Sequence, residues 1–360
     1  MKTPIEIPPA EAPAVLAHED QATRLRALMA KGAPPTGAHA HAHAPIVTPP
    51  RLDRRLPTFN LAPAALDNHT TPRLGADEIR SARVIAVASG KGGVGKTNIC
   101  VNLASAFSDL GCRTVLLDGD LGLANADVLC GISVRGHLGH VIDGARTIEE
   151  ITVDAPGGFR LVPGAGGLAR LADIDDQRRD GLVRGLAALD RDADVVIVDC
   201  GAGVGANVIA FTLAADCTLA ITTPEPTAMA DAYGLLKSVA MASRDRRAAV
   251  IAKQKPTIAM LINQARDHGE ATTVLRRMQD VADRFLGVNL IDAGWIPEDP
   301  AVPDAVRKRS PFLVCHPKRP AAQRVRIVAR DLRNLLELTA SDDVDRPGLA
   351  SRLLHRLVRL

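Results

Sequence analysis

Residues 90–97, GKGGVGKT, constrain the fold of this chain more than any other stretch. They lie between a short run of apolar and β-branched residues, VIAVAS at 84–89, and a helix-like stretch that begins at Lys96. The pattern G-x-x-x-x-G-K-[ST] in a strand–loop–helix setting predicts a phosphate-binding loop. The glycines let backbone N–H groups turn inward around phosphate oxygens, and the helix N-terminus adds positive potential. The alternative is that the segment is a glycine-rich turn without a function. The strand-end aspartates described below argue against that alternative.

The residues of this loop divide into expected roles. Lys96 should reach the β- and γ-phosphates of a nucleotide, and Thr97 should bind Mg²⁺. A phosphate-binding loop needs only one lysine, yet this loop carries a second, Lys91. The residues expected to contact the nucleotide are Gly90, Lys91, Gly92, Gly93, Val94, Gly95, Lys96, Thr97 and Asn98.

Two later strands end in carboxylates. TVLLD ends at Asp118, with Asp120 two residues further on, and VVIVD ends at Asp199. Because the carboxyl ends of parallel strands line the ligand crevice of an open sheet, these side chains should lie near the loop. We expect Asp199 and Asp118 to serve the metal and Asp120 to position or activate the attacking water. An aspartate at a strand end is also often only a helix cap, and that alternative remains open for each of them.

The rest of the chain indicates one α/β domain with attachments. Apolar strands that alternate with helices predict a doubly wound, mostly parallel sheet covered on both faces. We expect this domain at 83–338, after a mostly disordered segment at 1–80 that is rich in Pro, Ala and His and contains one helix at about 18–32. The expected strands lie at 84–89, 114–118, 160–164, 195–199, 217–223, 257–263 and 290–297.

The composition excludes several classes of protein. The net charge of +3 does not indicate strong non-specific binding to nucleic acid. No run of eighteen apolar residues is present, so no spanning helix is expected. The six cysteines form no CxxC pair and are interpreted as small core residues in a reducing cytosol.

Four segments together resemble the MinD/ParA ATPases. SGKGGVGKT at 89–97, with its additional lysine, is similar to the deviant Walker A loop of that family. DGDLGLANAD at 118–127 resembles its first switch, DCGAG at 199–203 its second switch, and GWIPEDPAV at 294–302 its adenine-side loop. The resemblance implies a P-loop fold, Mg²⁺-dependent ATP hydrolysis, and ATP held between two protomers of a homodimer.

The same resemblance implies roles for individual residues. Lys91 would reach across to the nucleotide of the partner protomer. A second cation does not fit easily on the same phosphates within one subunit, whereas in the dimer it would neutralise transition-state charge. The residues implied to be catalytic are therefore Lys91, Lys96 and Asp120. Asn263 and Pro297 match positions that flank the adenine, and Asn125 and Gly203 match switch positions.

Two further segments narrow the resemblance to the flagellar number regulators of the FlhG/FleN group. TPEPTAMADAYGLLK at 223–237 and the KTN variant of the loop are similar to that group. The segment at 20–26, DQATRLR, matches an N-terminal element that activates the SRP-type GTPase FlhF. The implied partners are an FlhF-like GTPase and flagellar switch (C-ring) components. The implied activator residues are Asp20, Gln21, Ala22, Leu25 and Arg26.

The last residues, 348–360, predict an amphipathic helix that follows a charged hinge at 339–347. One face of this helix is apolar, and the opposite face carries only Arg and His, with no acidic residue. Such a helix suits an anionic membrane surface. We therefore expect a cytoplasmic protein that binds reversibly to the inner face of the cytoplasmic membrane. The alternative is that the helix packs back on the domain, and both arrangements could occur in different nucleotide states. The expected membrane residues are Leu349, Leu353, Leu354, Leu357 and Val358.

Two other functions compete with this interpretation. A ParA/MinD-type ATPase could act on nucleoid DNA or the division site, but the terminal helix and the DQATRLR segment argue against it. An iron–sulfur carrier of the same fold needs closely placed pairs of cysteines, and Cys200 stands alone beside the second switch.

Overall fold

The computed structural model describes residues 81–120, 124–164, 176–244, 257–338 and 348–357. Contacts divide the chain into two units, Met1–Ala76 and Asp77–Leu360, and the second unit holds every described residue. The predicted helix at 18–32, the hinge and Val358 lie outside these residues. The predicted boundaries between disordered segment, domain, hinge and terminal helix therefore stay predictions.

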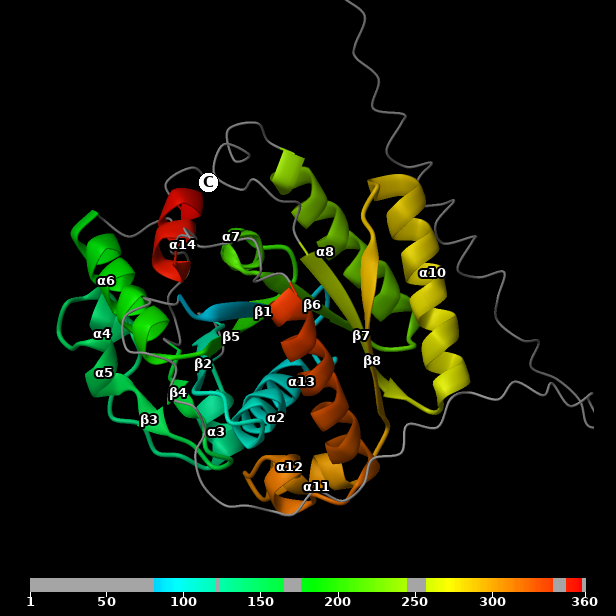
Figure 1. Cartoon of the computed structure of the whole chain (residues 1–360), viewed down its shortest axis with the longest axis horizontal. Coiled ribbons are helices and arrows are strands. Elements are labelled where there is room, and N and C mark those ends of the chain that lie inside the picture. The colour runs from blue at the N-terminus through cyan, green and yellow to red at the C-terminus, as the bar shows by residue number, and fades with distance from the viewer. Residues whose placement is uncertain (1–80, 121–123, 165–175, 245–256, 339–347, 358–360) are drawn as a thin grey trace, which may run out of the picture. The chain divides into compact units, whose positions relative to one another are not determined.

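One eight-stranded sheet forms the centre of the domain, in the order β3-β4-β2-β5-β1-β6-β7-β8 (Figure 1). Every neighbouring pair of strands is parallel except β3 and β4. The predicted doubly wound α/β class is thereby confirmed. The strands are β1 Arg83–Ser89, β2 Thr114–Gly119, β3 Val153–Asp154, β4 Arg160–Val162, β5 Val195–Ala202, β6 Cys217–Thr222, β7 Thr257–Ala265 and β8 Leu290–Pro297.

Helices cover both faces of this sheet. Helices α2 and α13 pack against each other on one face, and α7, α8 and α10 follow one another on the other (Figure 1). The helices are α2 Lys96–Asp109, α3 Ala126–Cys130, α4 Leu138–Ile142, α5 Ile148–Ile151, α6 Asp176–Asp192, α7 Ala206–Ala214, α8 Pro226–Arg244, α10 His268–Leu286, α11 Ala301–Arg307, α12 Phe312–Cys315, α13 Pro320–Leu338 and α14 Leu349–Leu357.

The central strands are buried along their whole length because both of their faces are covered. All six residues of β2 and of β6 are buried. Such buried, largely apolar strands are typical of parallel sheets with helices on both sides. The cysteines are all free and four of them are buried, as expected for small core residues. Among the described residues, no helix combines the length and hydropathy needed to cross a membrane.

Candidate functional site

The glycine-rich loop joins the end of β1 to the start of α2, as the sequence predicts. Gly93 and Gly95 have φ angles of 84° and 86°, in the left-handed region that other residues avoid. A Cβ atom on Gly95 would also lie only 2.6 Å from Asn263 Nδ2. The loop is therefore restricted to glycine at this point by both its backbone conformation and a neighbouring side chain.

Helix α8 leaves no room for a side chain at position 90. A Cβ atom at this position would lie 1.9 Å from the carbonyl oxygen of Asp231, far inside contact distance. Asp231 belongs to the TPEPTAMADAY segment, which resembles the flagellar regulators and which the sequence also predicts to be an ordinary strand–loop–helix, with Thr227 near the N-cap and Asp231 in the first turns. The structure explains part of this pattern, because α8 packs directly against the phosphate loop.

Lys96 and Asp199 form an ion pair at the centre of the site. The distance from Lys96 Nζ to Asp199 Oδ1 is 2.6 Å, and both side chains are buried. Burial is the largest single influence and lowers the pKa of the Lys96 ammonium, but the charge and hydrogen bond of Asp199, together with Cys100 and Cys200, raise the pKa above its ordinary value. The two residues predicted to bind phosphate and to serve the metal are thus brought together.

The second carboxylate oxygen of Asp199 fits a role in metal binding. This buried atom, Oδ2, has no hydrogen-bond partner among the described residues. Buried acceptors are almost always satisfied, so an orphaned carboxylate oxygen marks a place for a donor or a cation. A water molecule of a hydrated Mg²⁺ ion would satisfy it, and Thr97, the second residue of α2, lies in the same loop–helix junction.

Asp118 organises the turn of the first switch. Its Oδ2 accepts hydrogen bonds from the backbone N–H groups of Asn125 (3.0 Å) and Ala126 (3.1 Å), and its Oδ1 accepts one from Asp120 (3.2 Å). Burial, and next the charge of Asp199, raises the pKa of Asp118 to about 6, although these hydrogen bonds act to lower it. Both carboxylate oxygens of Asp118, which the sequence predicts to serve the metal, therefore already accept hydrogen bonds from backbone N–H groups of the first switch.

The second switch contacts the first switch at Gly201 and the end of β1 at Gly203. A Cβ atom on Gly201 would lie 3.5 Å from the carboxylate of Asp120, so the first switch lies close to the second. Gly203, with a φ of 93°, donates its N–H to the carbonyl of Ser89 at the end of β1 (2.9 Å). Asn125 precedes the first residue of α3. These predicted switch residues are gathered at the carboxyl ends of β1, β2 and β5.

Asn263 holds the phosphate loop rather than standing free. Its Nδ2 donates a hydrogen bond of 2.7 Å to the carbonyl oxygen of Val94, and the side chain is buried. Pro297 ends the neighbouring strand β8, in register with Ala265 of β7. The structure thus places both residues at one end of adjacent strands, and their expected contact with adenine stays a prediction.

Lys91 is paired within its own subunit. Its ammonium donates to Glu225 Oε2 (2.9 Å) and to the hydroxyl of Thr227 (3.1 Å). The pair is largely exposed, and the hydrogen bond from Lys91 lowers the pKa of Glu225. Sequence reasoning missed this contact because it joins residues that are 134 positions apart, although both lie in motifs that the sequence singled out.

Asp299 holds the adenine-side loop in place, a role that the sequence reasoning did not assign. It is buried and accepts hydrogen bonds from the backbone N–H groups of Ala301 (2.9 Å) and Ala321 (3.2 Å) and from the Arg319 guanidinium (2.8 Å). These contacts tie the adenine-side loop to the start of α13. The available signal was the position of Asp299 just before α11, where aspartate commonly caps a helix.

Asn98, the last residue predicted from the loop, contributes to packing in α2. Its carbonyl accepts a hydrogen bond from Asn102 Nδ2 (2.7 Å), and Asn102 Oδ1 in turn accepts one from the N–H of Leu313 in α12 (2.8 Å). The Asn98 side-chain oxygen also accepts from Asn102 Nδ2 (3.3 Å), so the KTN variant begins a polar chain that reaches from the loop to α12.

The terminal helix α14 packs on the domain, which is the alternative that the sequence left open. It contacts α6 and α7, and Leu349 and Leu353 are buried there. Arg352 Nη1 donates to Asp216 Oδ1 at 2.9 Å, with 14% and 10% of the two side chains exposed. The side chains of Leu354 and Leu357, and all of Val358, lie outside the described part of the chain. The same is true of the activator residues Asp20, Gln21, Ala22, Leu25 and Arg26.

A glycine-rich loop between a strand and a helix, with a buried lysine beside a strand-end aspartate, defines a P-loop nucleotide hydrolase. Residues 85–312 match the family model of the CobQ/CobB/MinD/ParA nucleotide binding domain. The chain is 38% identical to the antiactivator FleN of Pseudomonas aeruginosa, over 69% of this chain and 85% of that protein. It is 31% identical to the flagellum site-determining protein YlxH of Helicobacter pylori, over 81% of this chain and 96% of that protein.

A solved structure shows the same fold. The septum site-determining protein MinD from Pyrococcus horikoshii, complexed with Mg-ADP, superposes with a TM-score of 0.56 at 23% identity, over 72% of this chain and 99% of that one. This chain belongs to the MinD/ParA family of P-loop ATPases, as a member of its FleN/YlxH type. It is an ATPase, as the sequence predicted. Two solved structures of the same fold contain ADP together with Mg²⁺.

Proposed function

We propose that this ATPase controls the number and placement of flagella by forming an ATP-bound homodimer on the inner face of the cytoplasmic membrane. The observation that carries the proposal is the similarity to FleN and YlxH, which extends over 85% and 96% of those proteins. It is supported by the second lysine of the loop, which a single phosphate site does not need. The four steps of the proposal are nucleotide binding, dimerisation, membrane attachment and partner activation, and each can be tested separately.

Nucleotide binding uses the ion pair at the centre of the site. Lys96 would leave Asp199 for the β- and γ-phosphates, while Thr97 and Asp199 would hold Mg²⁺, whose charge stabilises the transferring phosphoryl group. Asp120 would then position the attacking water. Lys96→Ala should abolish nucleotide binding, measured by equilibrium dialysis with labelled ATP. Retained affinity for ATP would refute the assignment of the loop.

Dimerisation depends on Lys91, which now contacts Glu225 and Thr227 (2.9 and 3.1 Å). The ammonium would exchange these exposed contacts for the phosphates of the nucleotide in the facing protomer. Exposed ion pairs contribute little to stability, so the resting contact does not prevent that exchange. Lys91→Ala should bind ATP and remain monomeric by multi-angle light scattering, whereas the wild type should dimerise. A dimer of normal affinity in Lys91→Ala would contradict this role.

Membrane attachment would follow release of helix α14 from α6 and α7, its position in Figure 1. Its leucines would enter the lipid boundary and its arginines would contact anionic headgroups. One short helix binds weakly, so two helices in a dimer would bind far better through avidity. Anionic vesicles should float the protein with ATP and not with ADP. Flotation that ignores the nucleotide, or tight DNA binding without flotation, would refute the proposal.

The N-terminal segment would act on a separate partner. Residues 20–26 match the activator element of the flagellar group, and we infer that they order on the surface of an FlhF-like GTPase. Flagellar switch (C-ring) components would be further partners. A peptide of residues 14–32 should stimulate GTP hydrolysis by that partner, and the same peptide with Gln21→Ala and Leu25→Ala should not. Equal rates with both peptides would argue against this segment as the activator.

A further inference from the structure

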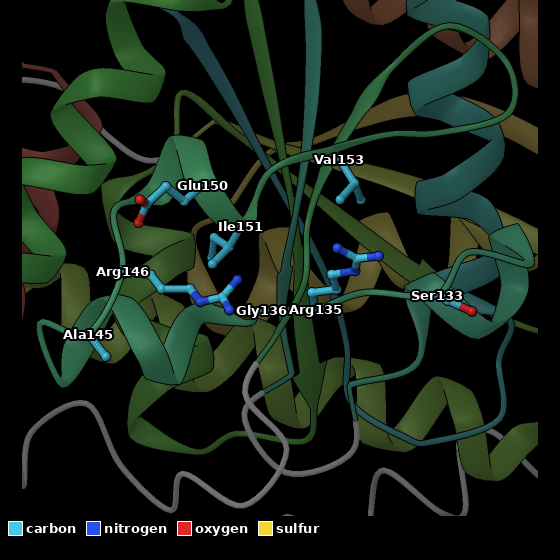
Figure 2. A pocket seen from close by; sticks show the side chains of 8 residues that line it. All are labelled: Ser133, Arg135, Gly136, Ala145, Arg146, Glu150, Ile151 and Val153. Carbon is cyan, nitrogen blue, oxygen red and sulfur yellow. The ribbon is translucent and has the colours of Figure 1, made fainter.

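A hollow of about 670 Å³ lies beside β3, the strand at one edge of the sheet. Its lining comes from the segments on either side of α4, from α5 and from β3 (Figure 2). No residue of this lining belongs to the candidate nucleotide site. Small-molecule sites usually have volumes of about 300–1,000 Å³ and combine apolar walls with a few polar groups. The hollow is therefore large enough to be considered as a second binding site.

Two arginines line the hollow without a partner. Arg135 and Arg146 are both exposed, and no ion pair or side-chain hydrogen bond engages either guanidinium in the described part of the chain. Glu150 is the acidic residue of the lining, but its Oε2 accepts the N–H of Thr147 at 2.8 Å and so caps helix α5. Two positive side chains and one negative side chain leave the lining with a net charge of +1.

The surrounding loops restrict where the Arg146 side chain can lie. The N–H of Arg146 donates to the carbonyl of His140 at 3.2 Å, which fixes its backbone. A Cβ atom on Gly136 would lie 2.5 Å from Ile151 Cγ2 and 3.3 Å from Arg146 Nη1. Glycine at position 136 therefore provides the space that the guanidinium occupies, and any larger residue would displace it or Ile151.

We propose that this hollow binds a small organic dianion whose two charged groups contact Arg135 and Arg146. A guanidinium presents planar N–H donors that match a carboxylate or a phosphate in a bidentate manner. Two such groups at one hollow select a ligand with two anionic ends. Ile151 and Val153 add apolar wall to the same hollow, which suits a short hydrocarbon or similar linker between the two anionic groups (Figure 2).

The test is a titration followed by NMR at the arginine Nε–Hε groups. The full chain is first saturated with Mg²⁺ and ADP, so that the phosphate loop is occupied. Inorganic pyrophosphate and glutarate are then added separately, as a phosphate probe and a carboxylate probe. Resonances are assigned from Arg135→Lys and Arg146→Lys. At least one probe should give saturable shifts at both arginines, and the probe that binds assigns the anionic group.

Three variants and one control decide the outcome. Arg135→Ala and Arg146→Ala should each weaken binding of that probe at least tenfold. Gly136→Ala should also weaken it, although it removes no charge. Arg276→Ala, which removes an exposed and unpaired arginine of α10, should change the affinity less than twofold. Absence of saturable shifts with both probes, or an equal loss in Arg276→Ala, would overturn the proposal, because either result indicates only general ionic effects.

Discussion

Asp216→Asn should release helix α14 from the domain without altering the helix itself. Asp216 Oδ1 accepts the hydrogen bond from Arg352 Nη1 at 2.9 Å, and its Oδ2 accepts the N–H of Val84 at 2.7 Å. Asparagine keeps an oxygen for Val84 but removes the charge that faces Arg352. All the residues of α14 that are expected to enter a membrane stay unchanged, so any change in membrane binding reports on docking alone.

The magnitude follows from the contacts of Arg352. Among the described residues, Asp216 is its side-chain partner, and Arg352 Nε and Nη2 are buried without one. Loss of a hydrogen bond to a charged group costs about 1.5–3 kcal/mol. Burial of Leu349 and Leu353 contributes about 1.5–3 kcal/mol for each side chain, so the helix keeps part of its docking free energy. The docking equilibrium should weaken by about 10- to 150-fold.

The domain itself should lose little stability in this variant. Burial raises the pKa of Asp216 despite the charge of Arg352, so the carboxylate is poorly solvated where it lies. Removing one partner of a buried ion pair is strongly destabilising only while the other charge stays buried, and release of α14 returns Arg352 to solvent. The cost therefore falls mainly on Arg352, whose guanidinium loses its counter-ion in the docked position.

Two measurements check this prediction. Hydrogen exchange of the α14 amides, in the ADP state, should accelerate by the factor above while β1 and β6 keep their protection. Flotation with anionic vesicles should then appear in ADP, where the wild type should stay in solution. Asp280→Asn, at an exposed position of α10, is the matched control. Unchanged exchange in α14 would refute the docking argument, and faster exchange without flotation in ADP would refute the link to the membrane.

Three further predictions concern the loop and its neighbours. Gly90→Ala should reduce ATP affinity at least tenfold, measured by isothermal titration calorimetry, because its Cβ would lie 1.9 Å from the carbonyl oxygen of Asp231. Normal affinity would show that α8 can shift to accommodate the methyl group. Glu225→Gln should increase the fraction of ATP-bound dimer measured by light scattering, because Lys91 loses its anionic partner within the subunit. A smaller fraction of dimer would instead assign Glu225 a role in the dimer itself. Because folding raises the pKa of Asp118 to about 6, the free energy of unfolding should fall by about 3 kcal/mol as the pH rises from about 4 to about 6. In urea unfolding of the nucleotide-free protein, Asp118→Asn should remove this pH dependence.

The sheet and the loop were predictable because their signals are local. Each parallel strand buried on both faces is an apolar run, and all seven expected strands are present, including the weak one at β4. The short elements β3, α3, α4 and α5 were not predicted. They have two to five residues each, too few to show either a period of two or a period of 3.6.

The contacts of the site were less predictable than its members. The motifs identified Lys91, Lys96 and Asp199, but not that Lys91 pairs with Glu225 or that Asn263 holds the carbonyl of Val94. These contacts join strand ends and loops that only the completed sheet brings together. Helix α14 illustrates the same limit, since an apolar face beside a cationic one suits both a lipid surface and a groove that offers a carboxylate such as Asp216.

The contact between Gly90 and α8 restricts how the phosphate loop can move. The loop has no free space on that side, so it can widen only if the helix shifts with it. Helix α8 has 19 residues and is therefore about 28 Å long. At its far end, Arg244 donates a hydrogen bond to the carbonyl of Leu286, where α10 ends. A displacement of the outer ends of α8 and α10 would thus be transmitted along α8 to the phosphate loop at Gly90.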